Sequence, residues 1–203
     1  MLNGKARVAV LVSGGGTNLQ AILDAQDAGI ITHGEVCLVV SSSATAYALE
    51  RAKNHGVKAE VLAEKNGFEA KLQALLETEH IDLIVLAGFM RILSGDFTSR
   101  WPRRIINVHP ALIPSFCGKG MYGLKVHEAA LSYGVKVTGA TVHFVNEIPD
   151  GGEIIAQKAV DILPGDTPEV LQKRVMTQAE WILLPRAVEE VSAAICNTSD
   201  NRR

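Results

Sequence analysis

An apolar run near the start of the chain restricts the fold more than any other feature. Residues 7–12 (RVAVLV) are almost uninterruptedly apolar, and the run ends abruptly at Ser13-Gly14-Gly15-Gly16. A strand of this composition is buried on both faces, as in a parallel sheet with helices on either side. Leu19, Ile22 and Leu23 then recur at helical spacing. The opening of the chain therefore predicts a strand–turn–helix unit of an α/β protein.

The same alternation continues along the chain. Further strands are predicted at 36–40, 57–62, 82–87 and 105–109, and helices at 44–55, 67–78 and 124–132. Two last strands, 135–146 and 153–162, follow without a helix between them. A final helix is predicted from Thr167-Pro168 toward Ala194, with Pro185 kinking or breaking it.

This order of elements predicts one doubly wound, mostly parallel sheet flanked by helices, with antiparallel strands at one edge. We expect a single domain over residues 1–203, with a core of about 5–195 and a polar tail at 197–203.

Composition and charge exclude several classes of protein. The 203 residues are 47% hydrophobic and 21% charged, with a net charge of −2, which is ordinary for a globular protein without a broad basic surface for nucleic acid. No apolar run approaches the ~20 residues of a membrane helix, and the N-terminus lacks a signal peptide's apolar region. Cys37, Cys117 and Cys196 are far apart and predict free thiols. We expect a cytoplasmic protein that binds neither membranes nor nucleic acid.

The strongest chemical signal is the pair Asn107 and His109 with Asp150 further along. Two positions apart on a strand, the carboxamide and the imidazole leave on the same face, and Pro110 ends the strand. Asp150 precedes two glycines and can orient the imidazole. Such a set suits acyl transfer: an amide N–H for a developing oxyanion, an imidazole to move protons and a carboxylate to favour its protonated form.

The glycine turn after the first strand has two readings. Glycines let a ligand approach the backbone, and the following helix N-terminus offers N–H groups to an anion. The spacing matches neither the dinucleotide fingerprint nor a P-loop, so a tight turn without a ligand stays open. Thr17 and Gln20 also fit a capping box, which would partly occupy the Thr17 hydroxyl.

Other candidates are weaker. His127 and His143 can be metal ligands, but no second histidine or cysteine at ligand spacing supports a metal, and we expect none. Cys117 has no activating neighbour and reads as an incidental thiol. The apolar segment 87–93 either lines a pocket or closes the core.

Taken together, several segments resemble the folate-dependent phosphoribosylglycinamide formyltransferases over about residues 7–191. They are SGGGTNLQAI, LAGFMRIL, INVHPALIPSF, GATVHFV, DGGEII and AEWILLP. The resemblance implies transfer of the formyl group of 10-formyltetrahydrofolate to the amine of 5-phosphoribosylglycinamide in purine (IMP) biosynthesis. It implies small-molecule substrates only, in a monomer or a homodimer. A 10-formyltetrahydrofolate hydrolase is the alternative, although its usual N-terminal regulatory domain is not expected here. A non-catalytic phosphate-binding module is the other alternative, which would not need the trio.

The resemblance also assigns roles to residues of this chain. The catalytic trio is Asn107, His109 and Asp150. Substrate-binding residues are Gly15, Gly16, Thr17, Asn18 and Glu180. Folate-binding residues are Met90, Arg91, Ile92, Leu93, Asn107, Asn146, Glu147, Ile148, Pro149 and Asp150. Three features depart from the family pattern. Trp181 stands after Glu180, where the family often has a histidine, and the spacing upstream of Glu180 differs from the pattern by up to one residue. Phe68 stands where some members have a basic residue, with Lys65 nearby, and the loop 117–123 is longer than in some members.

Overall fold

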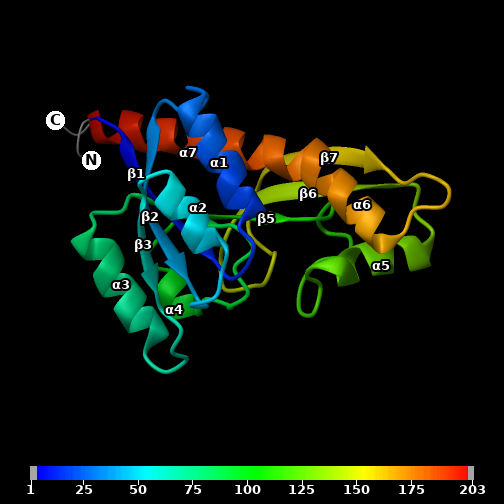
Figure 1. Ribbon diagram of the computed structural model, residues 1–203, viewed down its shortest axis with the longest axis horizontal. Coiled ribbons are helices and arrows are strands. Elements are labelled where there is room, and N and C mark those ends of the chain that lie inside the picture. Colours follow the sequence, from blue (N-terminus) through cyan, green and yellow to red (C-terminus); the bar gives the residue numbers. More distant parts are fainter. Residues whose placement is uncertain (1–3, 201–203) are drawn as a thin grey trace.

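The computed structural model describes residues 4–200 and contains one seven-stranded sheet (Figure 1). The strand order is β3-β2-β1-β4-β5-β6-β7. The strands are β1 (Ala6–Val12), β2 (Gly34–Ser41), β3 (Lys58–Val61), β4 (Leu83–Leu86), β5 (Ile105–His109), β6 (Val137–Phe144) and β7 (Ile154–Asp161). The pairs among β1 to β5 are parallel, whereas β6 and β7 join at one edge as antiparallel strands. The predicted sheet is therefore confirmed.

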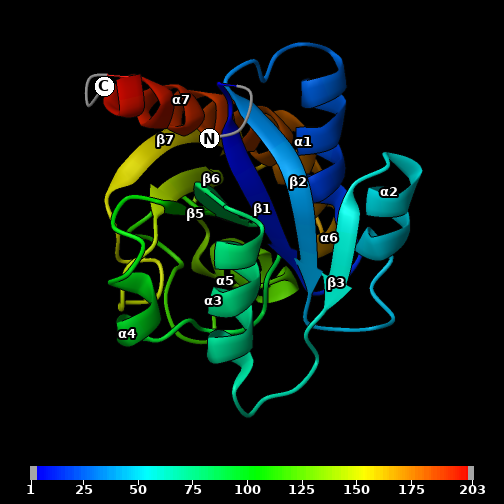
Figure 2. The same cartoon turned by 90° about the vertical axis from the view of Figure 1, so that its left-hand side faces the viewer.

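Helices cover both faces of this sheet (Figure 2). They are α1 (Thr17–Asp27), α2 (Ala48–Asn54), α3 (Phe68–Thr78), α4 (Gly95–Thr98), α5 (Leu124–Tyr133), α6 (Pro168–Val175), a π-helical turn (Met176–Glu180) and α7 (Trp181–Asp200). Side chains of α1, α2, α6 and α7 belong to one core, and those of α3 and α4 belong to the other. Helix α5 packs beside α6. Within residues 4–200, no helix combines the length and apolar composition needed to cross a membrane.

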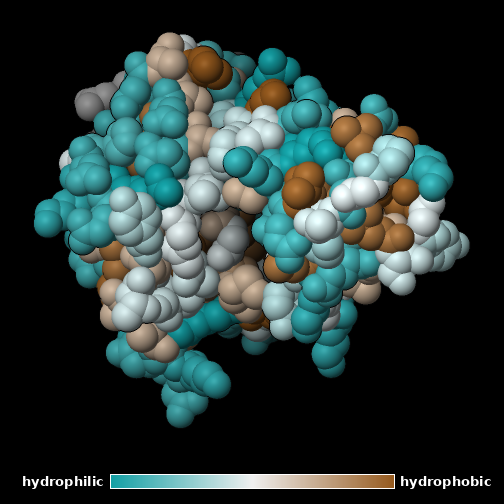
Figure 3. Space-filling model, turned by 45° about the vertical axis from the view of Figure 1, so that its right-hand side comes forward, coloured by the Kyte–Doolittle hydropathy of each residue, from teal (hydrophilic) through white to brown (hydrophobic). Residues whose placement is uncertain are grey.

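The first strand shows how the sequence produces two cores. Val8, Val10 and Val12 belong to the core under α1 and α7, while Ala9 and Leu11 belong to the core under α3. All five are fully buried. Because successive side chains on a strand point to opposite faces, only a continuous apolar run can fill both cores. Outside these cores, the face shown in Figure 3 is mainly hydrophilic, with apolar side chains in separate groups.

The parallel strands bring their carboxyl ends to one edge of the sheet. Strand β1 lies between β2 and β4. The strand order therefore runs outward from β1 to β2 and β3 on one side, and to β4 and β5 on the other. Open α/β sheets bind ligands in the crevice at such a switch point. The turns after β1, β4 and β5 all reach this edge.

Two local predictions in the first quarter of the chain differ from the structure. The N-cap of α1 is Gly16 in a left-handed conformation, with no side-chain cap bond, so the predicted capping box is wrong. The Gln20 amide instead contacts Asp24 and His55. As a result, the Thr17 hydroxyl is not used as a cap. Helix α2 begins at Ala48, later than predicted, after a polar turn at 42–47.

The last helix is irregular before Pro185 rather than at it. Pro185 lies inside α7, and the preceding turn, Met176–Glu180, is π-helical. The π turn ends just before Trp181, whose carbonyl would meet the proline ring in a regular helix. A π turn also accommodates one additional residue, which matches the one-residue difference from the family pattern upstream of Glu180. Residues 197–200, expected in a polar tail, continue α7, and residues 201–203 lie outside the described part.

Candidate active site

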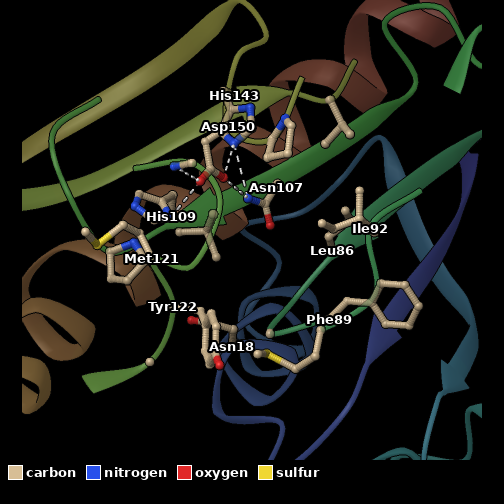
Figure 4. Close-up of a pocket in the computed structure, with 18 of the residues that line it drawn as sticks. Asn18, Leu86, Phe89, Ile92, Asn107, His109, Met121, Tyr122, His143 and Asp150 are labelled. Carbon is tan, nitrogen blue, oxygen red and sulfur yellow. Dashed lines mark hydrogen bonds and ion pairs between the residues drawn. The ribbon is translucent and has the colours of Figure 1, made fainter. Parts of the chain in front are cut away.

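A cavity of about 550 Å³ opens at the carboxyl edge of the sheet (Figure 4). Its walls come from the start of α1, the segment after β4, the ends of β5 and β6, the loops 118–123 and 148–150, and the π turn. Thirteen predicted site residues line it: Thr17, Asn18, Met90, Arg91, Ile92, Leu93, Asn107, His109, Asn146, Ile148, Pro149, Asp150 and Glu180. Gly15, Gly16 and Glu147 do not reach the cavity wall.

The Asp150 carboxylate lies at the centre of the predicted trio. Its Oδ2 atom is 3.5 Å from Nδ1 of His109, and its Oδ1 atom is 3.5 Å from Nδ2 of Asn107. The Gly118 backbone N–H donates to Oδ2 at 2.9 Å. The structure thus brings together three groups that are separated by up to 43 residues in the sequence.

Asp150 is charged in this environment. Burial raises the pKa of the carboxyl, but the nearby His143, the charge of His109 and the Gly118 N–H together hold the pKa below its usual value. The residue has a φ of 57°, a left-handed conformation that aspartate tolerates better than most residues. Such backbone strain occurs where a fold fixes a functional group.

Both ring nitrogens of His109 face acceptor oxygens. Its Nε2 atom lies 2.9 Å from the Phe116 carbonyl oxygen, which can only accept, so Nε2 carries a hydrogen. Its Nδ1 atom faces the Asp150 carboxylate. The ring is 4% exposed, which shields this pair from solvent. His109 is thus placed to hold a proton between two acceptors.

His143 is a site residue that the sequence analysis considered only as a metal ligand and did not place beside the trio. It pairs with Asn107 across β5 and β6, and its Nε2 atom lies 3.1 Å from the Asn107 amide nitrogen. The sequence contained the residue, but its facing partner follows only from the register of β5 against β6.

His127 is a second histidine at the cavity. It is fully buried on α5, and neither ring nitrogen has a hydrogen-bond partner among the described residues. Burial, with a smaller contribution from the positive charge of His109, lowers the pKa of His127 to about 4. His127 is therefore neutral at physiological pH. Among residues 4–200, no group of three or more His, Cys, Asp or Glu side chains is arranged to hold a metal ion.

The polar end of the cavity lies at the start of α1. The Asn18 amide donates to the Glu180 carboxylate at 2.7 Å, which joins α1 to the π turn. Burial raises the pKa of Glu180, and this hydrogen bond offsets part of the rise. The first backbone hydrogen bond of α1 runs from the Gln20 N–H to the Gly16 carbonyl, so the N–H groups before Gln20 point out of the helix end. Figure 4 shows Asn18 and Tyr122 at this end, opposite the trio.

The segment after β4 forms an apolar arm of the cavity. Met90 and Ile92 are exposed, and the Met90 N–H donates to the Ser13 hydroxyl at 2.9 Å. The Arg91 guanidinium donates to the Ala63 and Glu64 carbonyls and lies over the Phe68 ring. This stacking fixes Arg91 beside a second hollow, which is also lined by Lys65.

Comparison with known proteins explains this geometry. Residues 6–188 match the family described as formyl transferase. The chain belongs to the formyl transferase family. It is 38% identical to the phosphoribosylglycinamide formyltransferase of Haemophilus influenzae, over 96% of this chain and 91% of that protein. The structure of glycinamide ribonucleotide transformylase 1 from Symbiobacterium toebii superposes with a TM-score of 0.86 at 42% identity, covering 95% of this chain and 90% of that chain.

Longer formyl transferase relatives also match. The trifunctional purine biosynthetic protein adenosine-3 of Bos taurus is 40% identical over 98% of this chain. The chain spans about a fifth of the length of that protein, because the match covers 20% of it.

Proposed function

We propose that this formyl transferase transfers the formyl group of 10-formyltetrahydrofolate to the amine of 5-phosphoribosylglycinamide. One observation carries the proposal: a polar end and an apolar arm of one cavity meet at Asn107, His109 and Asp150. An anion at the helix N-terminus and a flat apolar ring along 90–93 would place amine and formyl group beside the trio.

The trio supplies the groups that the transfer needs. The substrate amine forms a C–N bond to the formyl carbon, and the carbonyl electron pair moves to oxygen. An Asn107 N–H and the His109 imidazolium stabilise that oxygen. His109 gives its proton to the departing nitrogen and takes up the proton that the amine releases. The electron pair on oxygen re-forms the carbonyl as the old C–N bond breaks. Asp150 stabilises the imidazolium throughout.

Substrate binding follows the two ends of the cavity. Thr17 and Asn18 hold the phosphate, behind the turn that Gly15 and Gly16 form, and Glu180 accepts from the ribose hydroxyls. Met90 to Leu93 and Asn146 to Asp150 enclose the folate ring. Lys65 and Arg91 border the second hollow and face the acidic end of the folate. A single domain, a monomer or homodimer and a cytoplasmic location belong to the same proposal.

A spectrophotometric assay tests this function. Purified protein is mixed with 10-formyltetrahydrofolate and phosphoribosylglycinamide, each omitted in turn, beside His109→Ala. We expect deformylation that requires the glycinamide and is lost in the variant. Deformylation without the glycinamide would instead show a hydrolase, and no deformylation with both substrates present would contradict the proposal.

A further inference from the structure

We propose that His143 is a positioning residue for Asn107: its neutral imidazole, with the proton on Nδ1, fixes the direction of the Asn107 carboxamide. The proposal rests on the proposed function for its kinetic test, and a spectroscopic test stands apart from it.

The sheet places His143 directly beside Asn107. The two residues are register partners on the antiparallel strands β5 and β6, so their side chains share one face. The pairing of β6 with β7 shifts register between Val142 and His143, an irregularity of the kind that redirects a side chain next to active sites. His143 is 1% exposed, which leaves its ring little freedom.

One hydrogen bond defines where His143 carries its proton. Its Nδ1 atom lies 2.8 Å from the Phe144 carbonyl oxygen, which only accepts, so Nδ1 holds the hydrogen. Gly152 keeps this carbonyl in place: a Cβ at Gly152 would lie 1.7 Å from the Phe144 oxygen. In the neutral ring, Nε2 is then an acceptor.

The acceptor at Nε2 fixes the amide of Asn107. A carboxamide can turn by half a rotation, but only its nitrogen can donate to Nε2, at the observed 3.1 Å. Figure 4 shows this nitrogen facing His143 and Asp150, with the amide oxygen toward the cavity. The second N–H makes only the long 3.5 Å approach to Asp150 Oδ1, which a formyl oxygen can replace.

Asp150 competes with the Asn107 amide for Nε2 of His143. Its Oδ1 atom lies 3.6 Å from Nε2 of His143. A second proton on His143 would turn Nε2 into a donor to Asp150 and remove the acceptor that holds Asn107. The neutral ring is therefore the form that keeps the amide oriented before the reaction, which is what oxyanion stabilisation requires.

Two substitutions of equal chemistry but different reach test the proposal. The Gln carboxamide in His143→Gln reaches the position of Nε2, whereas that in His143→Asn reaches only the position of Nδ1. We expect His143→Asn to lower kcat about 10²-fold, the cost of misplacing a group by about 1 Å, with KM for both substrates retained. We expect His143→Gln to recover most of that loss. Wild-type kcat in His143→Asn, or equal losses in both variants, would overturn the proposal.

A double-mutant comparison shows whether His143 acts through Asn107. In an Asn107→Ala background, His143→Asn should cause no further loss of kcat. A loss by the same factor in both backgrounds would overturn the proposal.

Nitrogen-15 NMR of the histidine rings tests the arrangement without any substrate. We expect a protonated Nδ1 and an unprotonated Nε2 for His143, with the Nε2 resonance shifting in Asn107→Ala. A protonated Nε2, or no shift in the variant, would overturn it. If the wild-type protein lacked transferase activity, the proposed function would fail while this measurement still decided the role of His143.

Discussion

At the scale of single residues, the site depends on one carboxylate between two imidazoles. Asp150 approaches His109 with one oxygen and His143 with the other, while its own backbone is left-handed. Removing the charge without changing the size should leave the imidazolium of His109 without its partner. We therefore expect the carboxylate to affect the proposed proton transfer more than substrate binding.

The first prediction concerns Asp150→Asn. We expect kcat to fall at least about 10²-fold, because general acid catalysis by His109 is lost, with phosphoribosylglycinamide affinity largely retained. Steady-state kinetics and a thermal-shift titration measure the two quantities. Asp96→Asn, the same change at an exposed position on α4, is the control and should behave as wild type. Loss of substrate binding in Asp150→Asn would instead indicate a structural role.

The sequence predicted those site residues whose relation is local. Asn107 and His109 are two positions apart at the end of a strand, and β5 ends at His109 as expected. His143 was considered only as a metal ligand, because its relation to Asn107 depends on strand pairing, which is a long-range property. The prediction of a Thr17 cap was wrong for another reason: Gly16, in a left-handed conformation, is the N-cap residue of α1. The roles of the site residues stay predictions.

At the scale of elements, the turn between β1 and α1 is shaped by a single glycine. Gly16 has a φ of 71°, and a Cβ there would lie 2.6 Å from Cβ of Ala48 on α2. Gly15 has open space around the same position. The close approach of α2 therefore requires glycine at position 16 but not at position 15.

The second prediction compares these glycines. Gly16→Ala should cost about 1–3 kcal/mol of unfolding free energy from backbone strain, with a contribution from the clash. It should also raise KM for phosphoribosylglycinamide about 10-fold or more, because the N–H groups of α1 shift. Gly15→Ala should leave both quantities near wild type. Chemical denaturation and kinetics check this, and similar behaviour of both variants would count against it.

The loop 116–123 contacts His109 and Asp150, the proposed catalytic groups, through its backbone. The Phe116 carbonyl accepts a hydrogen bond from His109 Nε2, and the Gly118 N–H donates one to the Asp150 carboxylate. For Nε2 to donate to a substrate, the Phe116 carbonyl must move away. Gly118 has a φ of 87° and Gly120 one of 90°, conformations that give this loop its particular path.

The third prediction is that Gly118→Ala lowers kcat severalfold, because a residue that resists this φ disturbs the bond to Asp150. Its stability cost should be about 1 kcal/mol, since the added Cβ meets no atom within 4 Å. Gly134→Ala is the matched control: its φ is 83°, its Cβ position is also open, and it lies at the end of α5. An equal loss of kcat in both variants would refute the special role of the loop.

Among the elements, the strands were the most predictable. The apolar runs of β1, β2, β4 and β5 are largely buried on both faces, so composition marks these strands. The last helix was less predictable, because a π turn has no clear sequence signature and Pro185 suggested a break one turn later. The helix also continues to Asp200, since the residues after Ala194 include neither Gly nor Pro to end it.

At the scale of the whole molecule, α7 ties the end of the chain to its first half. It packs against α1 and reaches β1 and β2. Glu189 on α7 accepts from the backbone N–H groups of Thr32 and His33 and from both of their side chains. These bonds join segments that are 156 or 157 residues apart in the chain. Long-range contacts of this kind stabilise the folded state as a unit.

The last prediction follows from Glu189 as a pH-dependent contribution to stability. Burial alone raises the pKa of this carboxyl, but the hydrogen bonds from His33 and Thr32 outweigh it and lower the pKa from 4.5 to about 2. Because the folded-state pKa is depressed, the stabilisation is complete above pH 4.5 and is lost as the pH falls toward 2. The side chain is 23% exposed, so solvent screening reduces the contribution to about 1–2 kcal/mol.

Glu189→Gln should therefore lower the unfolding free energy by about 1–2 kcal/mol at pH 7, and the difference from wild type should shrink by about half near pH 3. Urea unfolding across this pH range measures it. Glu190→Gln, at the exposed neighbouring position, should change stability by less than about 0.5 kcal/mol at either pH. A Glu189→Gln deficit that does not vary with pH would mean that packing of the side chain, rather than its charge, holds α7 against the first half of the chain.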